Sequence, residues 1–371
     1  MAAAPRRPAD ATRPMPGALA TLLQRHWWRP RLTPLTAALL PLAWLVGAVA
    51  ARRRARVHAA PLPVPVIVVG NVIVGGAGKT PTVIALAALL RSWGLDPGIV
   101  SRGHGRADAD VLLLDAGTPP SAATPAAFGD EPLLMHRRTG APVAVGRRRR
   151  AAARRLLAAH PAVDVLIADD GLQHHALPRD IELVVFDGRG IGNGRPLPAG
   201  PLRERAEAIW PCAADSPPRF ILVNGRWPEP PALALPAQRE HCFEADRALG
   251  GAVALPDWMR GAPATRAALH ALRGRPVLAA AGIGDPERFF TMLEAQGLAI
   301  GRLPLDDHAA FDTLPWPAGT ADVIVTEKDA VKLASHDLRG TRVWVATLDF
   351  SLPPALAHAL RGALAARRPA G

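Results

Sequence analysis

The chain has 371 residues, of which 49% are hydrophobic and 20% charged, and its formal net charge is +12. This balance excludes a disordered chain or a small disulfide-stapled protein, and the length allows two or three domains with a large core. Cys212 and Cys242 lie in no zinc-binding spacing, and reduced cytoplasmic thiols are the simpler interpretation. The basic excess favours anionic lipid or phosphorylated ligands, and the arginine run 147–150 lacks the interleaved aromatic residues that RNA stacking needs.

An apolar segment of the length that a bilayer requires lies near the N-terminus. Residues 32–51 contain no charged residue, and arginines flank the segment on both sides. Pro34 and Pro41 would kink a spanning helix, so the pattern favours an in-plane or partly inserted helix over a span. A signal peptide is disfavoured because the run is long and no small-residue cleavage site follows. We therefore expect residues 1–60 to form a membrane-associated segment with an anchoring helix.

A glycine-rich turn follows the apolar run 64–69 directly. Its sequence ends in Gly-Lys-Thr and leads into an apolar helical pattern. Glycines let backbone N–H groups approach phosphate oxygens, while the lysine reaches the β/γ-phosphates and the threonine hydroxyl reaches Mg²⁺. The residues expected to bind the nucleotide are Ile73, Val74, Gly75, Gly76, Ala77, Gly78, Lys79 and Thr80. The match is partial, because Ile73 stands where the usual pattern has its first glycine.

Strand-like and helix-like runs alternate over residues 61–228. This alternation predicts a P-loop NTPase-like α/β fold, with a doubly wound, mostly parallel sheet that binds ligands at the carboxyl ends of its strands. A Pro-rich stretch at 227–236 reads as a linker. Residues 229–371 form a second, smaller α/β domain, whose last helix (354–367) could pack back on the first domain. Within it, Gly282-Ile283-Gly284 is interpreted as a strand-to-helix turn.

Two acidic pairs stand at element ends. Asp169 and Asp170 end an apolar strand, which is how a Walker-B-type acid reaches Mg²⁺ at a sheet edge. Asp130 and Glu131 begin a helix, where they could act as a cap or hold a carboxylate near the γ-phosphate as a general base.

Several basic or mixed loops have weaker patterns. Arg102 and Arg203 lie in glycine-containing loops and suit an anionic ligand. His308 follows two aspartates and could orient a catalytic carboxylate. The segment 326–332 is equally well a capped helix start or a ligand contact.

These motifs together resemble the tetraacyldisaccharide 4′-kinases, or lipid A 4′-kinases. The segments GNVIVGGAGKTP, SRGHGR, FGDEP, DDGLQHH, PAGPLRE, DDHAAF and TEKDAVK occur in the family's order, and the resemblance runs from the N-terminal segment to at least Lys332. It implies transfer of the ATP γ-phosphate to the 4′-hydroxyl of a tetraacylated glucosamine disaccharide 1-phosphate. It also implies a location at the cytoplasmic face of the Gram-negative inner membrane, beside anionic lipid. No nucleic acid and no obligate protein partner is expected.

Carried over by position, the resemblance implies a role for each site residue. Lys79, Asp130 and His308 are the expected catalytic residues, and Arg102 and Arg203 the expected substrate contacts. The expected Mg²⁺ residues are Thr80, Asp169, Asp170 and Glu131, and the expected cofactors are ATP and Mg²⁺. The departures from the family pattern, His104 for a tyrosine and Phe128 for a smaller residue, remove no group that the chemistry needs.

Two alternatives stay open at the level of sequence. One is a switch ATPase with a deviant Walker A loop, although Val74 stands where those proteins carry an extra lysine. The other is a membrane-associated adaptor that binds nucleotide without catalysis. Dependence of ATP turnover on a lipid acceptor would discriminate between them and the kinase.

Overall fold

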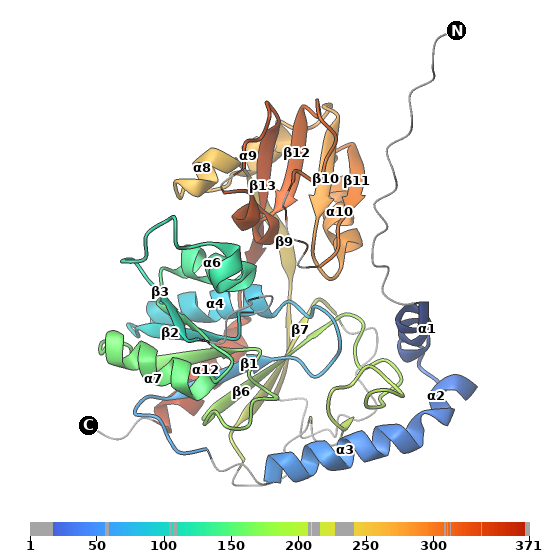
Figure 1. Ribbon diagram of the computed structural model, residues 1–371, viewed down its shortest axis with the longest axis vertical. Helices are drawn as coiled ribbons and strands as arrows, with labels where there is room; N and C mark the ends of the chain where they lie inside the picture. The colour runs from blue at the N-terminus through green and yellow to red at the C-terminus, as the bar shows by residue number, and fades with distance from the viewer. Residues whose placement is uncertain are drawn as a thin grey trace.

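The structure is a computed structural model, and it describes residues 18–55, 59–103, 106, 110–206, 209, 216–226, 241–307, 309, 311, 313–334 and 336–367. The strands of these residues form an eight-stranded and a five-stranded sheet, which lie one above the other in Figure 1. The prediction of a mixed α/β fold with parallel sheets is confirmed.

The larger sheet has the order β3-β4-β2-β5-β1-β6-β7-β8, and all its pairings are parallel except that of β3 with β4. Its strands are β1 (Val66–Gly70), β2 (Pro97–Ser101), β3 (Leu112–Leu114), β4 (Val143–Val145), β5 (Val165–Asp169), β6 (Ile181–Asp187), β7 (Arg219–Asn224) and β8 (Cys242–Ala245). Strand β1 is buried along its whole length between β5 and β6, as its unbroken apolar run requires. The turn that follows β1 therefore emerges in the middle of the sheet edge.

Helices cover the larger sheet. They are α4 (Lys79–Ser92), α5 (Pro125–Phe128), α6 (Asp130–Thr139), α7 (Arg149–Ala159) and the last helix, α12 (Pro354–Ala365). Leu356, Leu360 and Leu364 of α12 follow helical spacing and are buried in the core of this sheet. The C-terminal helix thus returns to the first sheet after the chain has built the second.

The smaller sheet has the order β11-β10-β12-β13-β9, with β9 antiparallel to β13. Its elements are β9 (Arg247–Ala254), α8 (Leu255–Met259), α9 (Arg266–His270), β10 (Val277–Ala281), α10 (Pro286–Ala295), β11 (Ile300–Pro304), β12 (Asp322–Thr326), α11 (Glu327–Ala330), the 3₁₀ turn η3 (Val331–Leu333) and β13 (Arg342–Phe350). Only Asp246 separates β8 in one sheet from β9 in the other. The chain crosses between the sheets there and crosses back between β13 and α12.

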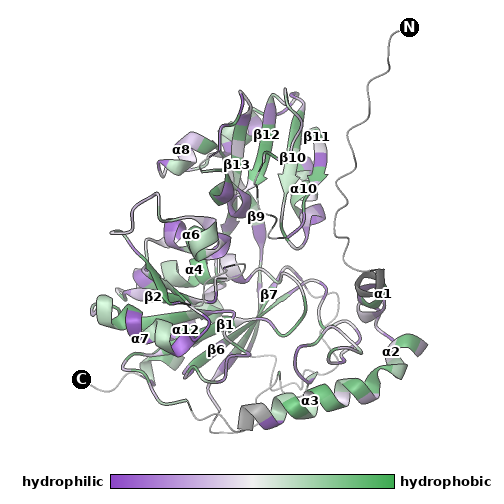
Figure 2. Ribbon diagram, in the orientation of Figure 1, coloured by the Kyte–Doolittle hydropathy of each residue, from purple (hydrophilic) through white to green (hydrophobic). Residues whose placement is uncertain are grey.

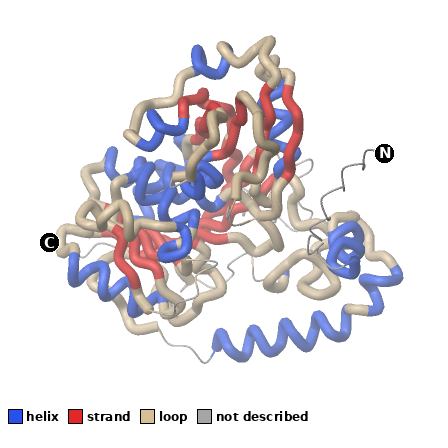
Figure 3. Tube along the Cα trace, turned by 45° about the horizontal axis from the view of Figure 1, so that its top comes forward, coloured by secondary structure: helices blue, strands red, loops and turns tan. Residues whose placement is uncertain are grey.

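The N-terminal segment forms three helices, α1 (Ala18–Trp27), α2 (Pro34–Ala38) and α3 (Leu40–Ala55). The expected helix over 32–51 is divided at Leu39, with a proline in the first turn of each part. Helix α3 runs along the outside of the molecule and is largely apolar (Figures 2 and 3). Its exposed apolar side chains are Leu42, Trp44, Leu45, Val46 and Val49. Among the described residues, no helix has the length and apolarity needed to cross a bilayer.

Some predictions lie outside the described residues. These are the linker 227–236, Cys212, His104 and His308. The domain limits at 60/61 and 228/229 stay predictions, although β8, beyond the second limit, pairs with β7 of the larger sheet.

Candidate active site

The glycine-rich turn connects β1 to α4 and has the backbone of a phosphate cradle. Gly75 and Gly78 have φ angles of 88° and 85°, which only glycine adopts without strain. Gly78 is the N-cap of α4, so free N–H groups and the positive end of the helix dipole gather at this turn. Gly76 lies against Gly284 of the turn that links β10 to α10. A Cβ added at Gly284 would lie 3.2 Å from the backbone nitrogen of Gly76. The second sheet therefore contributes one wall of the cradle.

A cradle whose N–H groups face a ligand leaves carbonyl groups that must be bonded on its outer side. Asn71, fully buried directly after β1, bonds two of them. Its Nδ2 donates to the carbonyl oxygens of Ile73 (2.9 Å) and Gly75 (3.0 Å), while its Oδ1 accepts from Lys79 Nζ at 3.2 Å. One side chain therefore fixes both the turn and the lysine.

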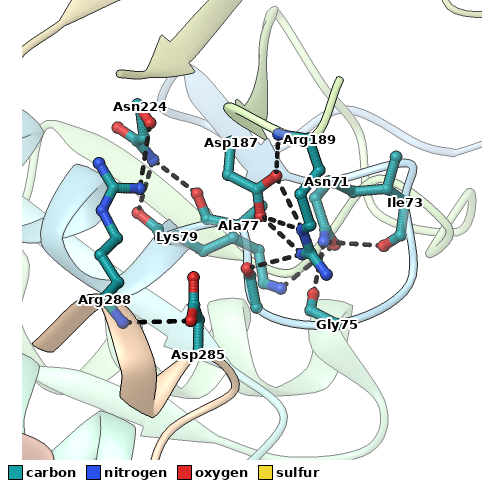
Figure 4. A network of polar contacts seen from close by, with 12 residues as sticks. Asn71, Ile73, Gly75, Ala77, Lys79, Asp187, Arg189, Asn224, Asp285 and Arg288 are labelled. Carbon is teal, nitrogen blue, oxygen red and sulfur yellow. Dashed lines mark hydrogen bonds and ion pairs between the residues drawn. The ribbon is translucent and has the colours of Figure 1, made fainter. Parts of the chain in front are cut away.

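Side chains from distant elements bond the next two carbonyls (Figure 4). Arg189, after β6, donates to the carbonyl of Gly76 at 3.3 Å and forms a bidentate pair with Asp187. Asn224 at the end of β7 and Arg247 at the start of β9 both donate to Ala77, at 2.6 and 3.2 Å. Burial lowers the pKa of Arg247 to about 10. The residue that begins the second sheet is thus fixed to the phosphate loop.

Gly78→Ala should abolish this arrangement. A Cβ at Gly78 would fall inside the Arg247 guanidinium and collide with Asn224, in addition to the strain of a positive φ. We expect ATP affinity to fall at least about 100-fold, since the loop must move away from its bonding partners. Isothermal titration with ATP would measure it.

Gly94→Ala is the matched control, because Gly94 also has a positive φ (77°) but nothing within 4 Å of its Cβ position. It carries the backbone strain alone, roughly 1 kcal/mol, and should leave ATP affinity unchanged. Equal ATP affinities for the two variants would show that the contacts at Gly78 do not shape the loop.

Lys79 faces the carboxylates at the end of β5. Its Nζ lies 3.5 Å from Asp170 Oδ1, and Arg203 lies 3.6 Å from the same oxygen. Asp169 accepts a 2.8 Å hydrogen bond from Ser101. The strand ends at Asp169, and Asp170 has a φ of 49°, so the alternation expected of a continuing strand does not apply.

The two carboxylates differ in protonation. Burial, together with the charges of Glu131 and Asp170, raises the pKa of Asp169 to about 7. Burial would also raise the pKa of Asp170, but Lys79 and Arg203 outweigh it and hold that pKa below its usual value. Asp170 is therefore ionised at neutral pH, whereas Asp169 is protonated in a substantial fraction of the molecules.

These acids fit a divalent cation. Oδ1 of Asp169 is buried without a hydrogen-bond partner, which is costly unless another ligand fills the place, whereas Oδ1 of Asp170 is compensated by its ion pairs with Lys79 and Arg203. Within the described parts of the chain no cluster of three or more His, Cys, Asp or Glu side chains forms a complete metal cage. Mg²⁺ in nucleotide sites needs only one or two carboxylates, because phosphate oxygens and water complete its shell. Thr80, half-buried in the first turn of α4, stands where such an ion takes a hydroxyl.

The second acidic pair is tied to the second sheet. Asp130 is buried at the start of α6, and its Oδ1 accepts from the backbone N–H of Glu131 at 2.9 Å. Lys328 Nζ lies 3.2 Å from Glu131 and 3.9 Å from Asp130, and Lys332 Nζ lies 3.7 Å from Asp130. Thr326 caps the short helix α11, which carries Lys328, and Lys332 lies in the 3₁₀ turn that follows, so the segment 326–332 is both a helix start and a contact to the acids.

Two further contacts hold α6 against the second sheet. Arg138 donates to both oxygens of Glu327, at 2.7 and 2.5 Å. Arg137 lies over the Trp258 ring at 4.3 Å and donates to that residue's carbonyl oxygen. These contacts fix the position of α6, and with it the two acids, relative to the second sheet.

A cavity of about 260 Å³ lies between the loop and the second sheet. Gly76–Thr80 form its floor, and Glu131, Asp187 and Lys328 contribute charge. Apolar side chains such as Ile84, Phe289, Met292 and Phe350 line the rest. A polar end at the loop and an apolar wall beyond it suit a phosphorylated ligand with a flat apolar part.

The structure thus brings together most of the side chains expected from the sequence. Lys79, Thr80, Asp169, Asp170 and Glu131 lie at one sheet edge, Asp130 stands beside Glu131, and Arg203 joins them through Asp170. Arg102 is exposed after β2. It is near enough to Arg149 to help lower the pKa of Arg149, although burial is the larger cause of that shift.

Sequence reasoning missed the loop-bonding residues Asn71, Arg189, Asn224 and Arg247. For Asn71 its place directly before the glycine-rich turn was an available signal.

Comparison with known proteins decides the family. Residues 35–365 match the family described as tetraacyldisaccharide-1-P 4′-kinase. The chain belongs to this family. A tetraacyldisaccharide 4′-kinase of Methylibium petroleiphilum is 52% identical over 371 aligned residues, covering 97% of this chain and 98% of that protein. One of Leptothrix cholodnii is also 52% identical, covering 95% of this chain and 98% of its own.

A solved kinase structure is similar as well. The crystal structure of Aquifex aeolicus LpxK in complex with ATP superposes with a TM-score of 0.72 at 26% sequence identity. The match covers 89% of this chain and 99% of that one. The fold of this family member and the ATP-bound neighbour therefore agree over nearly the whole chain.

Proposed function

We propose that this chain transfers the γ-phosphate of ATP to the 4′-hydroxyl of tetraacyldisaccharide 1-phosphate, giving the 1,4′-bis-phosphate precursor of lipid A. The observation that carries the proposal is that Lys79 and Glu131 line one cavity, that Lys79 lies 3.5 Å from Asp170, and that Asp130 stands beside Glu131 at the start of α6. A P-loop kinase core needs a phosphate cradle, acids for a metal and a carboxylate for the acceptor, and these residues are our candidates for the three roles.

The nucleotide end of the site is assigned to residues 73–80. The loop N–H groups and Lys79 hold the β/γ-phosphates, and Lys79 exchanges its contact with Asp170 for the phosphate oxygens. Thr80, Asp169, Asp170 and Glu131 are the residues that would hold Mg²⁺, and the main support is the buried oxygen of Asp169 that has no hydrogen-bond partner. Mg²⁺, when bound, neutralises the charge that develops on the transferred phosphate.

The acceptor end is assigned to Asp130. A buried carboxylate next to Glu131, which lines the cavity, can take the proton of a sugar hydroxyl, and Lys328 and Lys332 keep its charge compensated before substrate arrives. His308 is proposed to orient this carboxylate. Arg102 and Arg203 are proposed to contact the anionic substrate, because an arginine fork binds phosphate bidentately.

The N-terminal segment is proposed to dock at the cytoplasmic face of the inner membrane, where an acylated substrate is accessible. The apolar side chains exposed on α3 and the basic charge of the chain support this role. No protein partner and no nucleic acid is part of the proposal.

Trp44→Ala tests this docking. Trp44 is 72% exposed on α3, so it stabilises the folded protein little, and its loss should weaken vesicle binding about tenfold. Co-sedimentation with vesicles of phosphatidylethanolamine and phosphatidylglycerol measures the effect. Arg260→Ala, exposed on the second sheet's side, is the control. Unchanged sedimentation of the Trp44 variant would contradict docking through α3.

A further inference from the structure

The end of α1 packs on the loop that follows β6. Trp27 Nε1 donates to the carbonyl of Pro198 at 2.9 Å, and the Trp27 carbonyl accepts from Asn193 N–H at 2.8 Å. Gly192 has a φ of 57°, and a Cβ there would collide with the Trp27 carbonyl. Two backbones are thus in direct contact, so the N-terminal segment and loop 187–203 form one packed unit.

The other side of the same loop pairs with the phosphate loop. Val74 N–H donates to the carbonyl of Pro201 at 2.9 Å, and Arg203 N–H donates to the carbonyl of Val72 at 2.7 Å. Loop 187–203 therefore lies between the N-terminal segment and the nucleotide site and contacts both through its backbone.

Arg189 completes the connection with its side chain. Its guanidinium carbon lies 4.4 Å from the centroid of the Trp28 ring, within cation–π distance. The same group is paired with Asp187 and donates to the Gly76 carbonyl, and it covers Gly75, whose Cβ position lies 3.5 Å from it. Nε and Nη2 of the guanidinium donate to Asp187, the Trp28 ring covers one face, and Nη2 also donates to the phosphate loop at the Gly76 carbonyl.

We propose that Arg189 is a positioning residue of the phosphate loop and that Trp28 holds it in place, so that the N-terminal segment fixes the ATP-binding geometry. The proposal rests on the ATP site of the proposed function. Its physical reason is that the loop binds phosphate only when its N–H groups point inward, which requires the Gly76 carbonyl to be bonded outside. Asn71, Asn224 and Arg247 bond the neighbouring carbonyls from the core and the crossing strand.

A double-mutant cycle on the full chain in detergent tests this link. Isothermal titration with ATP and Mg²⁺, without lipid, gives Kd for wild type, Trp28→Leu, Arg189→Met and the double variant. We expect Arg189→Met to raise Kd about tenfold, through loss of a charge-assisted hydrogen bond. Trp28→Leu should raise it about threefold, and the double variant should equal Arg189→Met alone.

Two further variants separate positioning from structural packing. Trp28→Phe keeps an aromatic face and should restore Kd to within about twofold of wild type. Trp93→Leu removes the corresponding ring under Arg361 at the other end of α4, at 5.7 Å, and should leave Kd unchanged.

The contradicting outcomes are distinct from failure of the kinase itself. If Trp28→Leu lowers the melting temperature but leaves Kd for ATP unchanged, or if the two effects multiply to about thirtyfold, Trp28 does not act through Arg189. Phosphate transfer to lipid by the wild type is measured separately. Its absence would overturn the proposed function, whereas the ATP-binding cycle would still decide the role of Arg189.

Discussion

Lys79→Ala is expected to lower the rate of lipid phosphorylation about 10³-fold or more. The lysine is the loop's own cation at the β/γ-phosphates, and phosphoryl transfer depends mainly on positioning and charge stabilisation. In the structure its ammonium group donates to Asn71, which also bonds the loop, and lies 3.5 Å from Asp170. Transfer of labelled γ-phosphate to the lipid, with saturating ATP, measures the loss.

The control for this variant is Arg302→Ala. Arg302 pairs with Glu287 and Glu294 on the surface of the second sheet, so its removal should change neither activity nor stability appreciably. A folded Lys79→Ala protein with more than about a tenth of wild-type activity would contradict the assignment of the loop.

Asp130→Asn should lower kcat by about 10² to 10⁴-fold while changing KM for ATP little. The amide oxygen can still accept the backbone N–H of Glu131, so the start of α6 is kept, but the group no longer takes a proton. Steady-state kinetics with both substrates varied separates the two constants.

A first-turn acid elsewhere serves as the comparison. Asp257 occupies the first turn of α8 and pairs only with the exposed Arg260 among its described partners, so Asp257→Asn should leave kcat unchanged. If Asp130→Asn instead raised KM for ATP and spared kcat, the carboxylate would serve nucleotide binding, and another group would have to accept the proton.

The parts of the site that the sequence predicted are those encoded locally. An apolar run, a glycine turn and Gly-Lys-Thr specify β1, the phosphate loop and α4 within one short segment. The acids at the end of β5 follow from the rule that functional side chains gather where parallel strands end, and those of α6 from their place at a helix start. Each signal lies within a few residues of the group that it predicts.

The parts that escaped prediction depend on contacts between remote segments. Arg189, Asn224 and Arg247 bond loop carbonyls that lie 113, 147 and 170 residues away in the sequence. Strand β9 carries Gly250 and Gly251, which weaken its strand pattern, and it forms because β13 lies beside it. Lys328 could be seen as charged, but its contact with the acids of α6 requires the two sheets to meet.

The most direct test of the proposed kinase activity is γ-phosphate transfer by the wild-type protein to detergent-solubilised tetraacyldisaccharide 1-phosphate. We expect label in the lipid at the 4′-position, with ATP consumption that depends on the lipid acceptor. ATP hydrolysis without lipid labelling would contradict it and would favour a switch ATPase built on the same phosphate loop.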